Sequence, residues 1–250
     1  MFGEKKMIPK IIHYCWFGRN ELPPLAKKCI ASWRKFLPDY EIKEWNEDNY
    51  DIAKNAYMAA AYKEKKYGFV PDYIRSDLIY KYGGFYFDTD VEVIKPLDSL
   101  LQHKGIMGFE SKDLVAGGLI IAGEKGLEIF KEMRDIYDSI SFYNDDGSLN
   151  LTPSPVYNTN ILVKHGLQRN GMLQDVAGIT IFPTDYFCPK PSQFGKIKIT
   201  ENTLTIHHYA ASWIGSKQKF ANFLISIFGR RPVLFLWSIY NRFAKHNCNH

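Results

Sequence analysis

The chain has 250 residues, of which 46% are hydrophobic and 24% are charged. This is the composition of a folded globular protein, and it excludes a disordered one. The net charge is +5, from 32 Lys and Arg against 27 Asp and Glu. Because no dense basic stripe with interleaved aromatic residues runs through the main body of the chain, the sequence does not indicate a nucleic-acid partner.

The sequence also bears on the compartment. Its four cysteines are scattered and form no CxxC pair, so neither a zinc motif nor a redox motif is indicated. No uncharged apolar stretch reaches the roughly 18 residues of a membrane span. The N-terminus lacks the apolar core and the cleavage site of a signal peptide. We therefore expect a cytoplasmic protein, either free or peripheral on the inner face of the membrane.

Predicted strands and helices alternate along most of the chain. From the N-terminus we expect a strand at 8–18, a helix at 22–36, a strand at 40–45, helices at 53–67 and 72–82, and a strand at 85–94. Short strands at 106–109 and 119–122, helices at 126–140 and 158–165, and more short strands up to 206 complete the body. This α/β alternation predicts one domain over residues 1–215, with a mixed, mainly parallel sheet covered by helices on both faces.

Residues 216–250 are predicted to form a separate helical appendage. Apolar residues from Phe220 to Phe228 recur at helical spacing, a second apolar helix begins at Val233, and basic residues surround both. Each half is too short to span a bilayer. We expect residues 217–245 either to lie on an anionic membrane or to pack on the body or on another subunit.

The segment from Phe85 to Glu92 contains the pair Asp88 and Asp90. In a strand, residues i and i+2 point to the same side, so the two carboxylates would repel each other unless a cation lay between them. At the carboxyl end of a strand beside a crevice, they could hold Mg²⁺ or Mn²⁺ that also binds phosphate oxygens. The alternative is a solvated acidic strand end. The flanking aromatic residues and glycine pair favour the metal site.

A second charged pair, Asp72 and Arg75, lies upstream on a predicted helix. The two residues are one turn apart, so their side chains can contact each other. Taken alone, the pair reads as a surface ion pair that contributes about 0–1 kcal/mol.

Four segments in order carry a resemblance to a known family: IPKIIHYCWFG at 8–18, PDYIR at 71–75, YGGFYFDTD at 82–90 and HHYAASW at 207–213. Together they resemble glycosyltransferase family 32, the DXD-containing sugar transferases, and more distantly the glucosyltransferase domains of large clostridial toxins. The resemblance implies a GT-A type nucleotide-diphospho-sugar transferase fold, a nucleotide-sugar donor, a divalent metal and retention of configuration at the anomeric carbon.

The resemblance also implies roles for individual residues. Its catalytic set is Asp88, Asp90, Arg75 and Asp72. Its metal ligands are Asp90 and Asp88 with one of two late histidines, His208 before His207; the alternative is a hydrogen-bonded core histidine. Trp16 would stack on the base, and the nucleotide-sugar-binding set would be Trp16, Tyr14, Asn46, Asp72, Arg75, Tyr86, Asp88, Ser212 and Trp213.

One segment departs from the family pattern. Many retaining relatives place an amide or carboxylate side chain on the loop that faces the anomeric carbon. Residues 115–118, Val-Ala-Gly-Gly, offer none, and Asp113 and Glu110 lie before that place. Double displacement and front-face substitution both stay open, and no nucleophile is assigned.

Two other classes of function compete with the transferase. Residues 87–91 also fit the motif of haloacid-dehalogenase phosphatases, with Asp88 as nucleophile, but that motif normally follows the first strand of its fold. A non-catalytic sugar-binding module would not need a metal site. We therefore expect a metal-dependent retaining glycosyltransferase that moves a hexose from a UDP-sugar to a polysaccharide or lipid-linked saccharide, in bacterial capsular polysaccharide assembly.

Overall fold

The computed structural model describes residues 7–190 and 195–210, which belong to one compact unit that ends at Ala210. The predicted appendage at 216–250 and its membrane contact lie outside the described residues, so they stay predictions, as does the domain boundary at 215. Within the described ranges, no helix is both long and apolar enough to cross a bilayer.

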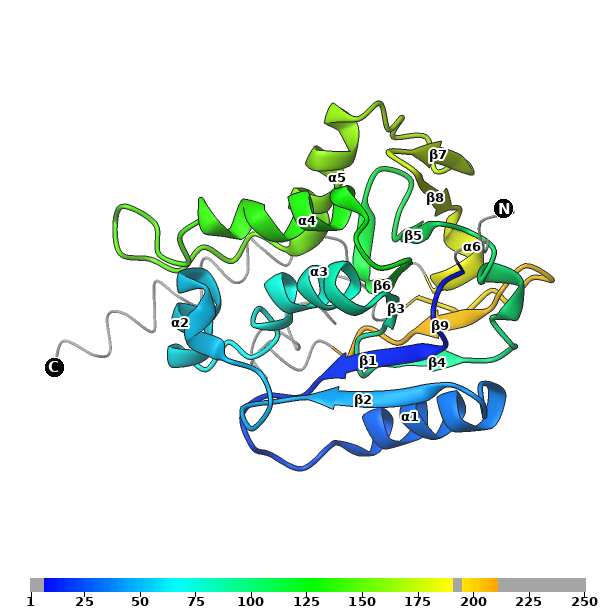
Figure 1. Ribbon diagram of the computed structural model, residues 1–250, viewed down its shortest axis with the longest axis horizontal. Coiled ribbons are helices and arrows are strands. Elements are labelled where there is room, and N and C mark those ends of the chain that lie inside the picture. The colour runs from blue at the N-terminus through cyan, green and yellow to red at the C-terminus, as the bar shows by residue number, and fades with distance from the viewer. Residues whose placement is uncertain (1–6, 191–194, 211–250) are drawn as a thin grey trace, which may run out of the picture. The chain divides into compact units, whose positions relative to one another are not determined.

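The centre of the unit is a seven-stranded sheet with the order β2-β1-β3-β6-β5-β8-β7 (Figure 1). Its strands are β1 (Ile11–Cys15), β2 (Glu41–Trp45), β3 (Gly84–Tyr86), β5 (Gly105–Phe109), β6 (Val115–Gly123), β7 (Gln174–Val176) and β8 (Ile179–Phe182). Strands β2, β1, β3, β5 and β8 run in one direction, whereas β6 and β7 run in the other. The prediction of a mixed, mainly parallel sheet is confirmed.

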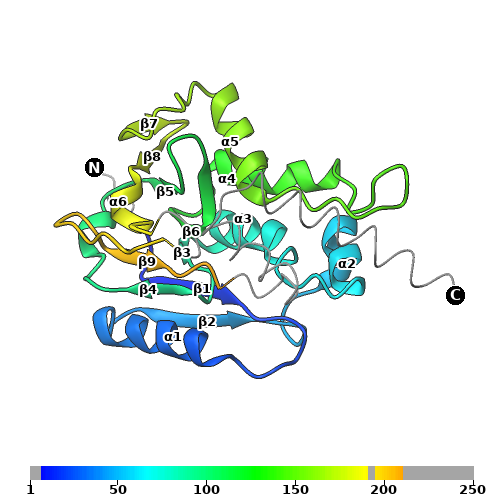
Figure 2. The ribbon, with the colours of Figure 1, turned by 180° about the vertical axis from the view of Figure 1, so that it is seen from behind.

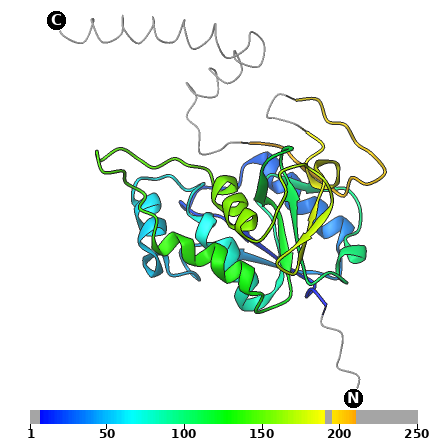
Figure 3. The same ribbon diagram turned by 90° about the horizontal axis from the view of Figure 1, so that it is seen from above.

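Helices cover both faces of this sheet, as predicted. One face packs against α2 (Ala56–Lys63), α3 (Pro71–Tyr82), α4 (Glu128–Asp135) and α5 (Ser154–Lys164). The other face packs against α1 (Pro24–Phe36) and α6 (Thr184–Phe187) (Figure 2). Alternation along the strands divides the core, since Cys15 and Tyr86 point to the first face while Ile12 and Phe85 point to the second. Helix α5 packs against the central strand β6 (Figure 3).

Helix α3 lies in the core, and its first nine residues are all buried. Pro71 occupies its first turn, where a missing N–H costs least. Gly83 ends the helix with φ of 69°, and a Cβ there would lie 2.9 Å from the carbonyl oxygen of Gly123. Only glycine fits this position, which leads the chain directly from α3 into β3.

A second, two-stranded sheet pairs β4 (Val91–Val93) antiparallel with β9 (Thr205–His207). The prediction of one strand over 85–94 is therefore wrong, because β3 and β4 belong to different sheets. Apolar alternation continues through the segment, but a turn at Asp88–Val91 redirects the chain.

Other element boundaries also differ from prediction. The helix expected at 53–67 is a 3-10 turn, η1 (Ile52–Lys54), followed by α2, and the helix expected at 126–140 is α4 followed by η3 (Ile136–Asp138). A further 3-10 turn, η2 (Asp98–Leu100), follows β4. Helix α5 starts four residues before its predicted start, because Pro155 is tolerated in a first helical turn.

The second sheet is fastened to α1 by two buried side chains. Trp33 Nε1 donates to the carbonyl oxygen of Val91 at 2.7 Å. Ser32 Oγ accepts from the Val93 N–H at 2.9 Å and donates to the carbonyl oxygen of Cys29 at 2.5 Å. These bonds hold the strand that follows Asp90.

We predict that Ser32→Ala lowers the free energy of unfolding by about 1–3 kcal/mol, because it leaves the buried N–H of Val93 without a partner. Urea denaturation of the purified protein measures this. The control is Ser99→Ala at an exposed serine, which should stay within about 0.5 kcal/mol of the parent. Equal stability of the two variants would contradict the prediction.

Candidate active site

Asp88 and Asp90 lie in the turn where the chain passes from β3 to β4. The Val91 N–H donates to the carbonyl oxygen of Asp88 at 3.1 Å, and the Asp88 N–H donates to that of Gly118 at 3.2 Å. The prediction from strand alternation, that the two carboxylates share one face of a strand, is therefore wrong. The turn brings them together instead, at the end of β3.

Arg75 joins helix α3 to this turn. Its Nη2 lies 2.9 Å from Asp72 Oδ1 and 3.5 Å from Asp88 Oδ1. Arg75 and Asp72 are only 4% and 6% exposed, so their contact is a buried ion pair and not the surface pair considered from sequence. The guanidinium lies over the ring of Tyr86, with 5.4 Å from Cζ to the ring centre. Its Nη1 donates to Ser154 Oγ on α5 at 3.4 Å.

Two glycines of β6 make room for these side chains. A Cβ at Gly118 would lie 2.3 Å from Asp88 Oδ2, and one at Gly117 would lie 3.1 Å from Arg75 Cδ. The pairing of β5 with β6 is interrupted here: Met107 pairs with Ile121 and Gly108 with Ala116, so residues 117–120 lie outside the register. Residues 115–118, which have no polar side chain, therefore form the surface against which Asp88 and Arg75 pack.

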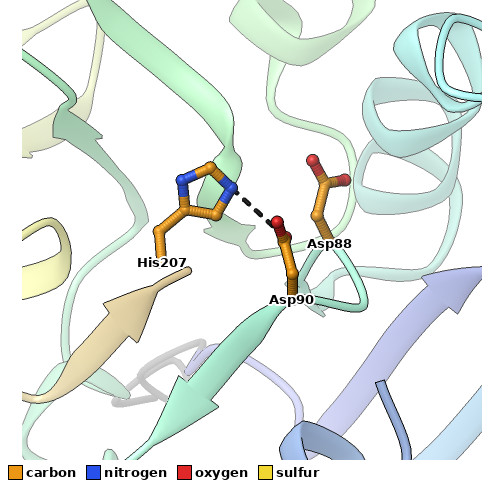
Figure 4. A group of neighbouring side chains, drawn as sticks. All are labelled: Asp88, Asp90 and His207. Carbon is orange, nitrogen blue, oxygen red and sulfur yellow. Dashed lines mark ion pairs between the residues drawn. The ribbon is translucent and has the colours of Figure 1, made fainter. Parts of the chain in front are cut away.

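Asp90 is held by the end of strand β9. Its Oδ1 lies 3.2 Å from His207 Nε2 (Figure 4). Its Oδ2 accepts from the Ala210 N–H at 2.7 Å. The His208 N–H donates to the backbone carbonyl oxygen of Asp90 at 3.0 Å. Segments more than a hundred residues apart in the chain are joined at this one carboxylate.

The two adjacent histidines point to different partners. His208 Nε2 lies 2.7 Å from Glu92 Oε2, and the same oxygen accepts from Lys28 Nζ at 2.9 Å. His207 faces Asp90 and Asp88. Neighbouring residues of an extended segment point to opposite sides. The geometry therefore reverses the expected order: His207, and not His208, stands with the aspartates.

Burial and charge shift the pKa of each acid differently. Burial raises the pKa of Asp88, against the pull of Arg75, and raises that of Asp72 to about 6. Burial also tends to raise the pKa of Asp90, but the contacts with His207 and the Ala210 N–H outweigh burial, so that the pKa of Asp90 is lowered. Burial tends to lower the pKa of His207, but the negative charges of Asp90 and Asp88 outweigh burial and raise this pKa. The three aspartates outnumber Arg75 and His207, so the site favours an added cation.

The donor atoms at this point fit a divalent metal. Asp88, Asp90 and His207 each offer one ligand atom, and these atoms all lie within 4.8 Å of one another (Figure 4). Two carboxylate oxygens and one imidazole nitrogen are ligands that first-row divalent cations accept. The residues present therefore fit the metal that the resemblance implies.

Two of the predicted nucleotide-binding residues, Trp16 and Asn46, follow the carboxyl ends of β1 and β2. Because β1 lies between β2 and β3, these residues reach the same edge of the sheet as Asp88. Trp16 is half-buried, and its Nε1 donates to the carbonyl oxygen of Asn20 at 2.6 Å. The Asn46 side chain is engaged in a turn, where it accepts from the Asp48 N–H and donates to Glu44 Oε1, both at 2.9 Å.

The other two, Tyr14 and Tyr86, lie in the core. They are 5% and 1% exposed, so neither offers a surface to a ligand. Tyr14 donates to Glu44 Oε2 at 2.5 Å and packs edge-on against Trp33. The ring of Tyr86 packs against the guanidinium of Arg75. Strand alternation turns one toward α1 and the other toward α3, which the motif alone did not reveal.

The remaining predicted residues, Ser212 and Trp213, lie outside the described residues. One residue without an assigned role does reach the site: Glu110, directly after β5. Burial raises the pKa of its carboxyl group, and the nearby His207 and Tyr209 act to lower it. Asp113 is exposed in the same hairpin. The sequence named Glu110 only as a carboxylate that precedes residues 115–118, and the path of β9 brings His207 near it.

We predict that His207→Ala lowers the affinity for Mn²⁺ by at least about tenfold, because loss of a ligand should cost no less than loss of a residue that orients one. Isothermal titration with Mn²⁺ measures this. His208→Ala is the matched control and should stay within about twofold of the parent. A larger loss in His208→Ala than in His207→Ala would overturn the assignment.

Part of the chain is similar to known glycosyltransferases. Residues 23–106 match the family described as glycosyltransferase sugar-binding region containing DXD motif. Inositol phosphoceramide mannosyltransferase 3 of Schizosaccharomyces pombe is 34% identical over 105 residues, which are 40% of this chain and 29% of that protein. Inositol phosphoceramide mannosyltransferase 1 of the same yeast is 29% identical over 110 residues, 40% of this chain and 33% of that protein. The chain thus spans about a third of the length of these relatives.

A solved structure, the PaToxG glycosyltransferase, superposes with a TM-score of 0.51 at 21% identity, over 64% of this chain and 69% of that one. The likeness bears on the fold, which is of the GT-A type, as predicted. The matched range contains Asp72, Arg75, Asp88 and Asp90. The resemblance indicated by the motifs is confirmed: residues 23–106 are similar to the glycosyltransferase sugar-binding regions that contain a DXD motif.

Proposed function

We propose that the chain is a metal-dependent glycosyltransferase that uses a nucleotide sugar. The observation that carries this proposal is the continuous row of charged side chains from Asp72 through Arg75 to Asp88, Asp90 and His207. One end of the row suits a cation, and the middle presents a guanidinium beside it. A nucleoside diphosphate linked to a sugar needs both groups.

Asp88, Asp90 and His207 would hold the metal. The bound cation would neutralise negative charge on the diphosphate as the sugar leaves. We propose Mn²⁺ in preference to Mg²⁺, since the imidazole of His207 is a softer ligand than the oxygens that Mg²⁺ prefers. The family match and the three convergent ligand atoms support the metal.

Arg75, Asp72 and Asp88 would bind the sugar and its diphosphate. Arg75 already has Asp72 and Asp88 on its Nη2, so its orientation is set before a ligand arrives. Asp72 and Asp88 offer carboxylate oxygens that accept from sugar hydroxyls. Trp16 stands at the same sheet edge as a stacking surface for the base. These roles follow the resemblance, as does retention of configuration at the anomeric carbon.

The names of the curated relatives bear on donor and acceptor. They are mannosyltransferases that act on inositol phosphoceramide. We propose that the donor is a hexose nucleotide, a UDP-sugar or a mannosyl nucleotide, and that the acceptor is a lipid-linked saccharide or other lipid headgroup. Work on such an acceptor would bring the protein to a membrane surface, and we propose that this is the cytoplasmic face.

The decisive assay is hydrolysis of a panel of UDP- and GDP-hexoses, with and without Mn²⁺, in the absence of acceptor. We predict slow, metal-dependent cleavage of one donor, and a loss of at least about 100-fold in Asp90→Asn, because the cation then lacks one carboxylate. Asp145→Asn, in an exposed loop, is the control. Phosphate release from simple monoesters without donor cleavage would instead support a phosphatase with Asp88 as nucleophile.

A separate prediction concerns the base. Trp16→Ala should weaken binding of the nucleoside diphosphate by about 1–3 kcal/mol, the contribution of stacking on an aromatic face. Titration of UDP and GDP in the presence of Mn²⁺ measures this. Tyr143→Ala, at an exposed aromatic residue, should bind as the parent does. An unchanged affinity in Trp16→Ala would remove its stacking role.

A further inference from the structure

The imidazole of His207 lacks the hydrogen bond that usually orients a metal-binding histidine. Its Nε2 lies 3.2 Å from Asp90 Oδ1 (Figure 4). Its Nδ1 is buried and has no hydrogen-bond partner in the described part of the chain. A histidine that binds a metal almost always donates its other ring N–H to a carboxylate, a carbonyl group or water. Among the described residues, a packing contact has to orient this ring instead.

Tyr209 makes such a packing contact. The centres of the Tyr209 and His207 rings are 4.3 Å apart, and the ring planes meet at 62°, which is an edge-to-face arrangement. The Tyr209 hydroxyl lies 3.0 Å from the Sγ of Cys188, which is buried. The phenol ring is therefore held at its hydroxyl end by a hydrogen bond while it packs against the imidazole. His207 thus has Asp90 at Nε2 and an aromatic ring against its own ring.

The backbone of Tyr209 is also unusual, because its φ of 54° lies in the left-handed region. This conformation is unfavourable for a bulky residue, and it persists only where the surrounding structure holds it. Both neighbours are held. The His208 N–H donates to the carbonyl oxygen of Asp90 at 3.0 Å, and the Ala210 N–H donates to Asp90 Oδ2 at 2.7 Å. The carbonyl oxygen of His208 accepts from Lys190 Nζ at 3.0 Å.

We propose that Tyr209 is a positioning residue for the metal site. Its ring orients the imidazole of His207, and its left-handed backbone aims the Ala210 N–H at the carboxylate of Asp90. The inference rests on the proposed function, because it assumes that these two side chains bind a divalent cation. It adds no ligand to the site. Tyr209 acts through its ring and its backbone, whereas its hydroxyl only secures the ring to Cys188.

The test separates the ring from the hydroxyl. Tyr209→Phe keeps the ring and removes the hydroxyl, whereas Tyr209→Gly removes the ring and accepts a φ of 54° without strain. Isothermal titration measures the affinity of each variant for Mn²⁺. The visible absorption of bound Co²⁺ gives a second readout, because its bands change when an imidazole ligand is lost. Tyr143→Gly, the same change at an exposed tyrosine, is the matched control.

We expect Tyr209→Phe to bind Mn²⁺ within about threefold of the parent and Tyr209→Gly at least about tenfold more weakly, as on loss of a residue that orients a metal ligand. The Co²⁺ spectrum of Tyr209→Phe should be that of the parent. The spectrum of Tyr209→Gly should shift toward that of His207→Ala, since the imidazole no longer holds its place at the metal. A purely structural role would lower stability without changing the ligands of the cation.

Other results would overturn the proposal in distinguishable ways. If the parent binds Mn²⁺ and Tyr209→Gly binds it equally well, the positioning role is wrong while the proposed function stands. An equal loss of affinity in Tyr209→Phe and Tyr209→Gly would show that the ring does not orient the imidazole. If the parent binds no Mn²⁺ and cleaves no donor, the proposed function fails and this inference fails with it.

A variant that does not fold is handled by a second substitution. If circular dichroism shows that Tyr209→Gly is unfolded, Tyr209→Asn replaces it, because asparagine also accepts the left-handed region and lacks an aromatic ring. The expected loss of Mn²⁺ affinity and the expected Co²⁺ spectrum are the same. Failure of both variants to fold would make Tyr209 a structural residue and overturn its positioning role.

Discussion

The buried guanidinium of Arg75 is the contact on which the rest of the site depends. It lies between Asp72, on its own helix, and Asp88, on the turn after β3, and it rests on the ring of Tyr86. Removing one partner of a buried ion pair is costly, because it leaves the other charge without compensation. This constraint fixes α3 against the turn. The remaining carboxylate of the motif, Asp90, is left to pair with His207 from the far end of the described chain.

The sheet supplies the space that these charges need. Strand β6 runs against its neighbours at the centre of the sheet, and its register with β5 is interrupted at residues 117–120. Gly117 and Gly118 lie in that interruption, and a methyl group at Gly118 would stand 2.3 Å from Asp88 Oδ2. Residues 115–118 lack polar side chains, but their two glycines leave the space that the charged side chains of Asp88 and Arg75 occupy.

Most of the architecture and part of the site could be predicted because their signals are local. Asp72 and Arg75 are one helical turn apart, and Asp88 and Asp90 are two residues apart, so short-range spacing was enough to propose that each pair lies together. The shared strand face expected for Asp88 and Asp90 was wrong, because a turn brings them together. Apolar periodicity indicated α1, β2 and α3 almost to their ends. The strand predicted at 85–94 failed for a physical reason: periodicity reports which residues are buried, and not which of two sheets buries them.

The sequence by itself determined an α/β fold of the DXD transferase type, a candidate metal motif in Asp88 and Asp90, and a charged pair in Asp72 and Arg75. Only the tertiary structure decided that His207 and not His208 faces the aspartates, that Tyr14 and Tyr86 are buried in the core, and that Glu110 lies near His207. The physical reason is that these outcomes depend on side-chain direction and on contacts between distant segments. A turn, an interrupted register and the end of β9 set them, and none of these leaves a periodic signal in the chain.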